Sequence, residues 1–268
     1  MLALAEFAAR LRDEEGAITI HTGDLTSWGA PGQFEAARAI LPEVLRDPKA
    51  LELAIPGNHD HWPGTGRVLG RSSGALGKHF SGLPWIRRLP LGPDRILTFA
   101  AIDSDADVLP WSNARALGRG HFQTQLAALD VLLPRPAPGE VRVLLMHHSP
   151  WLRKFHLGIT RSSRAALMAF LPRHGFRVIL CGHIHLARAH LQECAHGLVL
   201  EARCGSTTQR DCIPVGGTTS RHGIPHNTLI VHRLDEDDEG ALTWHSELYR
   251  HGLKGFEPAG MLAELPMP

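Results

Sequence analysis

The chain has 268 residues, of which 43% are hydrophobic and 21% are charged, and its formal net charge at pH 7 is +1. This length and composition are typical of a folded domain with a substantial core. The near-neutral charge gives no electrostatic reason to bind nucleic acid or an anionic membrane, and no apolar run reaches the roughly 20 residues of a membrane-spanning helix.

The N-terminal segment predicts an amphipathic helix. Glu6, Arg10 and Arg12 interrupt the apolar run that a signal peptide would need, while Phe7 and Leu11 share one helical face. The four cysteines contain no C-x-x-C pair, so without an export signal we expect reduced thiols. We therefore expect a cytoplasmic protein.

Strand and helix patterns then alternate along the chain. Strands are expected at 17–20, 51–55, 95–102, 141–146 and 177–181, and helices at 33–47, 120–133 and 162–175. Further strand patterns follow at 187–193, 197–203, 227–234 and 241–249, and residues 235–240 form an acidic turn. We expect one α/β domain over 1–268, with irregular segments within 62–119 that shape a pocket and a C-terminal strand and loose tail over 235–268.

Four of these apolar runs end in loops that carry metal-binding side chains. The loops are "TGDLT", "IPGNHDHW", "LLMHHSP" and "LCGHIHLA". Ligands of open α/β sheets bind beyond the carboxyl ends of the strands, so the four loops are expected to build one polar pocket. Oxygen and imidazole donors without cysteine favour manganese, iron or zinc. Gly23, Gly57 and Gly182 each precede a candidate ligand, where a tight turn leaves no room for a Cβ.

The order GD, GNHD, H and GHxH resembles the calcineurin-like metallophosphoesterase superfamily. The segments "TGDLTSWG", "IDSD", "GHFQTQLAALDVLL", "LLMHHSPW" and "VILCGHIHLA" are similar to its bacterial cyclic-nucleotide-phosphodiesterase-like branch. The resemblance extends from Ala17 to about Leu234. It implies an α/β/β/α sandwich of mixed sheets flanked by helices, and metal-dependent hydrolysis of a small phosphoester, most of all a phosphodiester, by a hydroxide that bridges two divalent ions.

The resemblance also assigns roles to residues of this chain. Asp24 would bridge the two metals, His185 would belong to the first site, and the second site would be completed by Asn58, His147 and His183. His59 would act as the acid near the leaving oxygen and would be oriented by Asp60. His148, His222 and His226 are candidates for contacting the substrate, and for the last two a plain surface loop is the alternative.

The chain departs from the family pattern at its N-terminus. The family begins with a strand that ends in Asp-x-His and holds the first metal, whereas this chain opens on the helix that should follow. Either two ions or only one are then expected. Three explanations are open: a natural start further upstream, a truncated chain, or a divergent member with one strong site. The alternative function is a catalytically impaired scaffold that binds metal or phosphate. The apolar residues of the tail are suited to covering a neighbouring element or to forming a homodimer.

Overall fold

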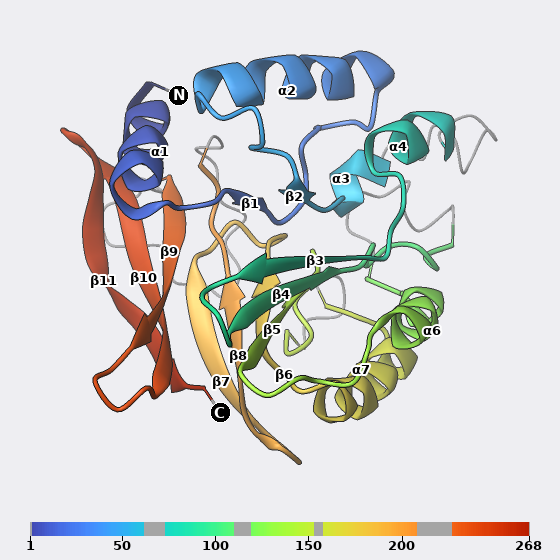
Figure 1. The fold of residues 1–268 in the computed structure, drawn as a ribbon. Helices are drawn as coiled ribbons and strands as arrows, with labels where there is room; N and C mark the ends of the chain where they lie inside the picture. The colour runs from blue at the N-terminus through green and yellow to red at the C-terminus, as the bar shows by residue number, and fades with distance from the viewer. Residues whose placement is uncertain (1, 62–72, 110–118, 153–157, 208–226, 268) are drawn as a thin grey trace.

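A six-stranded mixed sheet lies at the centre of the computed structural model, which describes residues 2–61, 73–109, 119–152, 158–207 and 227–267 (Figure 1). Its order is β3-β4-β5-β6-β8-β7, and β4, β5, β6 and β8 run parallel to one another. The bounds are β3 Trp85–Pro90, β4 Ile96–Ala101, β5 Glu140–Leu145, β6 Phe176–Cys181, β7 Arg188–Cys194 and β8 Gly197–Arg203. The inner strands are nearly continuous apolar runs because both faces of the sheet are covered.

Two helices cover one face of this sheet. They are α6 (Gln123–Leu132) and α7 (Arg161–Arg173), and they pack side by side in Figure 1. Leu129 and Phe170 from the helices enter one buried cluster with Leu144 and Ile179 from the strands. The Oγ1 of Thr160 accepts a hydrogen bond from the backbone N of residue 163 and so caps α7.

A second sheet covers the opposite face. It consists of β9 (Thr228–Glu236), β10 (Leu242–Gly252) and β11 (Gly255–Pro266), all antiparallel. Trp244 and Leu265 of this sheet pack against Val143 and Leu180 of the large sheet. On the outer side, Phe7 of α1 (Leu2–Glu15) packs against the second sheet. The order of layers is therefore α/β/β/α, which confirms the predicted fold class.

Short elements carry the chain between α1 and the large sheet. β1 (Ile20–His21) and β2 (Leu53–Ala54) pair in parallel, and the helices are α2 (Pro31–Val44), the single turn α3 (Asn58–His61) and α4 (Ser73–His79). Within the described residues, β1 pairs with β2 alone. None of the described helices has the length and apolar character to cross a membrane.

Two expectations about secondary structure are wrong. Within 62–119, the part before β4 that we expect to be irregular contains α4 and the edge strand β3; residues 62–72 and 110–118 lie outside the described residues. The C-terminal tail is not loose either, since residues 255–266 form β11 and pair along β10. Both strands depend on a partner that is not apparent from their own sequence.

Candidate metal centre

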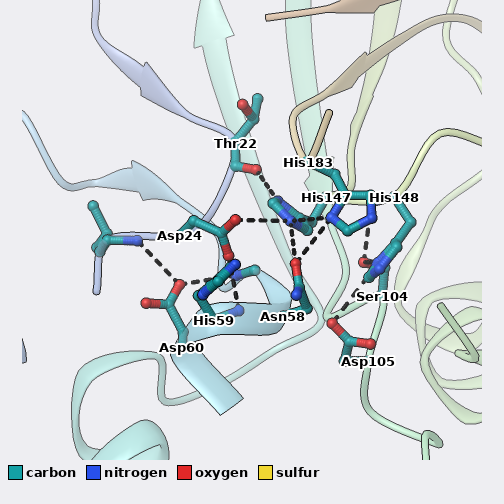
Figure 2. A network of polar contacts seen from close by, with 12 residues as sticks. Thr22, Asp24, Asn58, His59, Asp60, Ser104, Asp105, His147, His148 and His183 are labelled. Atoms are coloured by element: carbon teal, nitrogen blue, oxygen red, sulfur yellow. Dashed lines mark hydrogen bonds and ion pairs between the residues drawn. The ribbon is translucent and has the colours of Figure 1, made fainter. Parts of the chain in front are cut away.

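Four loops meet at the carboxyl ends of β1, β2, β5 and β6 (Figure 2). Asp24 follows β1, Asn58 begins the turn of α3 after β2, His147 follows β5, and His183 follows β6. Asn58, His147 and His183 are all at least nine-tenths buried. The structure thus brings together four of the five residues expected to bind metal.

The donor atoms of these residues lie as close as ligands around one ion. The Oδ1 of Asn58 is 3.0 Å from the Nε2 of His147 and 2.9 Å from the Nδ1 of His183. The two ring nitrogens are 3.2 Å apart, and the Oδ2 of Asp24 is 3.4 Å from the Nε2 of His147.

The hydrogen bonds around the centre show that this donor set fits a divalent cation. The Nδ1 of His147 donates to the carbonyl oxygen of Thr22 at 2.7 Å, so its Nε2 is the ring atom that faces the other donors. Metal-binding histidines commonly make this second hydrogen bond to a backbone carbonyl. The buried Nε2 of His183 has no hydrogen-bond partner among the described residues. A carboxylate, an amide oxygen and ring nitrogens that face one another need a cation or a proton between them.

The electrostatics agree with a site built for positive charge. Burial would raise the pKa of Asp24, but the charge and hydrogen bond of His147 hold it well below its usual range. Burial would lower the pKa of His147, but the charge of Asp24 and the hydrogen bonds raise it above its usual value. Burial and the neighbouring histidines lower the pKa of His183. Protonated His147 therefore balances Asp24 where a metal ion would otherwise do so.

Close packing explains two of the glycines. A Cβ at Gly57 would lie 2.2 Å from the Oδ1 of Asp24, and a Cβ at Gly23 would lie 2.4 Å from the Nδ1 of His147. Gly23 also has φ of +103°, a conformation that side chains disfavour. The two loops approach as closely as they do only because both residues lack a side chain.

Asp60 connects the first two loops. Its buried carboxylate accepts hydrogen bonds from the backbone N of Leu25 at 3.2 Å, of Thr26 at 2.8 Å and of Gly57 at 2.9 Å, and from the Oγ1 of Thr26 at 2.9 Å. Burial and the charge of Asp24 raise its pKa to about 6. Instead of orienting the ring of His59, as we had expected, Asp60 fixes the loop after β1 to the loop after β2.

His59 lies at the more open side of the centre. Its backbone N donates to the Oδ1 of Asp24 at 2.9 Å, and its ring Nδ1 donates to the carbonyl oxygen of Ser27 at 3.1 Å. With Nδ1 occupied, the Nε2 is the ring atom left to act on a substrate.

The other expected residues take different positions. Burial lowers the pKa of His185 and the charge of Asp24 acts on it, but its ring stays outside the group of donor atoms formed by Asp24, His147 and His183. His148 is fully buried, with its Nδ1 at 2.9 Å from the Oγ of Ser104, which is the setting of a supporting residue. His222 and His226 lie outside the described residues.

Sequence reasoning missed several residues that support the centre. The carbonyl of Thr22, the hydroxyl of Thr26 and the "IDSD" residues Ser104 and Asp105 all contact site residues, the last at 3.8 Å from the Nδ1 of His148. The "IDSD" segment had a signal, namely polar residues directly after an apolar strand, which is the pattern of the four loops already identified.

Comparison with known proteins points to one family. The model of the calcineurin-like phosphoesterases matches residues 2–187, which is more than half of the chain. Among the curated proteins, none matches this sequence. Among solved structures, GAP50, the anchor in the inner membrane complex of Plasmodium, has a TM-score of 0.52 at 10% identity, with 100% of this chain and 84% of that chain covered.

Two further structures are similar at lower scores. A putative 5′-nucleotidase from Staphylococcus aureus has a TM-score of 0.40 at 11% identity, and the comparison covers all of this chain but only 48% of the other. A predicted phosphoesterase from Streptococcus pneumoniae has a TM-score of 0.36 at 13% identity, with 98% and 90% of the two chains covered.

Proposed function

Because the chain belongs to the calcineurin-like phosphoesterase family, we propose that it hydrolyses phosphodiesters with divalent metal ions bound around Asp24. The observation that carries the proposal is the convergence of Asp24, Asn58, His147 and His183, whose donor atoms lie 2.9–3.4 Å apart in the pairs given above. The preference for diesters over monoesters is supported by the segments that resemble the cyclic-nucleotide-phosphodiesterase-like branch.

The four residues would hold the cation, and the mixture of oxygen and imidazole donors suits manganese, iron or zinc. When bound, such an ion supplies Lewis-acid stabilisation of phosphoryl charge and makes water acidic enough to attack phosphorus near neutral pH. The carbonyl of Thr22 holds the ring of His147 in the orientation that presents its Nε2. Asp60 keeps Asp24 opposite Asn58 by fixing the two loops that carry them.

His59 is the residue proposed to assist the leaving group. The carbonyl of Ser27 fixes the ring through Nδ1, and the partly exposed ring, in its doubly protonated form, can give the proton on Nε2 to a departing alkoxide. Hydrogen bonding to the Asp24 carboxylate places the backbone of His59 beside the ligands. A general acid at this position contributes typically about 10²–10⁴-fold to the rate.

A scaffold that binds metal without turnover is the second candidate. It is favoured by the position of His185, which stays outside the donor group, so that a further ion would have only Asp24 and His185 as ligands within the described residues. An ion with two protein ligands is held weakly.

Turnover of bis(p-nitrophenyl) phosphate with added Mn²⁺ distinguishes the two candidates. We expect hydrolysis by the unaltered chain, a loss of at least tenfold in kcat for His59→Ala, and loss of both metal and activity for Asn58→Ala. His174→Ala is the matched control, because His174 contacts Asp130 on the α6–α7 side of the large sheet and is not part of the metal centre. Equal rates with p-nitrophenyl phosphate would remove the diester preference, and metal binding without hydrolysis of either ester would favour the scaffold.

A further inference from the structure

A second group of metal-competent side chains lies outside the centre around Asp24. The Nε2 of His61 is 3.1 Å from the Oδ1 of Asp103, and one ligand atom each from His61, Asp103 and Asp105 lie within 4.8 Å of one another. The exposed fractions are 3% for His61, 7% for Asp103 and 1% for Asp105. The group shares no residue with the donor set of Asp24, His147 and His183.

The three residues come from two loops that the fold brings together. His61 ends the helical turn α3, and Asp103 and Asp105 follow β4. An imidazole and two carboxylates are one nitrogen and two oxygen donors, the set that zinc, manganese and cobalt accept. A metal ion held by three protein ligands has open coordination positions that water must fill, so the site needs access to water.

A cavity provides that access. Its volume is about 450 Å³, and it lies between α4, the loop before β3 and the start of α6. Asp103 and Gln125 are among the polar residues of its wall, and Pro56, Leu76, Phe80 and Leu83 are apolar residues of the same wall. Asp103 therefore belongs both to the group and to the wall of a space large enough for water.

We propose that His61, Asp103 and Asp105 bind a divalent cation that is independent of the centre around Asp24. The ion would connect α3 to the loop after β4 and would take its remaining ligands from water in the cavity. Ser104, between the two aspartates, contacts His148, so the ion would also fix the loop that supports the ring beside His147 and His183.

Counting ions in purified variants tests the proposal without measuring activity. Metal-free protein is titrated with Co²⁺, and the number of ions per chain is determined by calorimetry and by metal analysis after gel filtration. Asp103→Asn/Asp105→Asn keeps the size of the side chains and removes the two charges. His183→Ala removes a ligand of the other centre, and His174→Gln alters an unrelated histidine–aspartate contact. Near-UV circular dichroism confirms that each variant is folded.

The expected result is that the double variant binds one Co²⁺ fewer than the unaltered chain, that His183→Ala still binds an ion, and that His174→Gln changes nothing. An unchanged count in the double variant overturns the proposal, as does a folded His183→Ala that binds no Co²⁺. If the double variant does not fold, His61→Gln is counted in its place and the same results decide. Failure of the proposed hydrolysis would leave these counts unaffected, so the two proposals fail separately.

Discussion

Thr26 offers a direct test of how the centre is held together. Its hydroxyl donates to the Oδ1 of Asp60 at 2.9 Å and accepts from the backbone N of Gly29 at 2.9 Å, and the residue is 5% exposed. Thr26→Val keeps the shape and removes both hydrogen bonds. Because a buried donor and a buried carboxylate each lose a partner, the expected cost is about 2–3 kcal/mol in the free energy of unfolding.

For a chain of this size, each kcal/mol lowers the Tm by roughly 2–4 °C, so a decrease of roughly 5–10 °C is expected. Thermal unfolding followed by circular dichroism at pH 7.5 measures it. Thr124→Val is the matched control, because the hydroxyl of Thr124 also donates to an aspartate, Asp107, but at the surface, where a change within about 0.5 kcal/mol is expected. Equal decreases in the Tm of the two variants would refute the argument that the Thr26–Asp60 hydrogen bond contributes more to stability because it is buried between the two loops.

The remaining predictions concern packing, pH and charge. Gly57→Ala should abolish Co²⁺ binding at the centre around Asp24, because its Cβ would meet Asp24, and should leave the ion at His61, Asp103 and Asp105 in place. Gly32→Ala, with open space at its Cβ in the first turn of α2, should raise the free energy of unfolding by up to about 1 kcal/mol. Calorimetry measures the first effect and denaturation the second. Burial lowers the pKa of His232 to about 4, below its unfolded value. The contribution of His232 to the free energy of unfolding is therefore complete above about pH 6.5 and is lost as the pH falls towards 4. In urea unfolding, His232→Gln should lose less stability than the unaltered chain over that pH range. Arg142→Met leaves the side chain of Glu140 buried without its 2.8 Å partner and should cost about 3–5 kcal/mol in urea unfolding, part of which Arg142→Met/Glu140→Gln recovers.

The large sheet and the ligand loops could be predicted because their signal is local. Strand β8 lies at the predicted bounds, 197–203, β5 is shifted by one residue at both ends, and β6 begins one residue earlier than predicted. These strands are nearly continuous apolar runs, since helices cover one face and the second sheet the other. Parallel strands also end at one edge, so the loops after them had to converge whatever the details of the chain between.

Strands β3 and β11 could not be predicted because their partners determine them. The sequence of β3 is a basic segment flanked by prolines, and it forms a strand only because it pairs with β4 at the edge of the sheet. β11 contains Pro258 and Gly260, which normally argue against a strand, and its pairing with β10 shifts register at Ser246/Glu247 and Leu248/Tyr249. These irregularities accommodate residues that a regular ladder excludes.

The roles of Asp60 and His148 could not be predicted for a different reason. A sequence shows that a carboxylate follows His59, but it does not show which backbone N atoms lie within its reach. Asp60 finds those atoms in Leu25 and Thr26, some 35 positions earlier in the chain. His148 is adjacent to a ligand in sequence, yet the alternation of side chains after β5 directs it to Ser104 and into the interior.

The backbone at the centre is itself strained, and the hydrogen bonds explain why it persists. Asp24, His183 and His185 have φ of +59°, +74° and +51°, values that cost non-glycine residues roughly 1 kcal/mol or more each. The carboxylate of Asp60, the carbonyl of Thr22 and the close approach of Gly23 and Gly57 hold the loops in this form before any ion arrives. Since the strain and the close approach of the donors are already present in the metal-free protein, a cation has little further ordering to impose. It follows that residues such as Thr26 and Gly57, which touch no metal, should affect metal affinity as well as stability, because they maintain the conformation to which the ion binds.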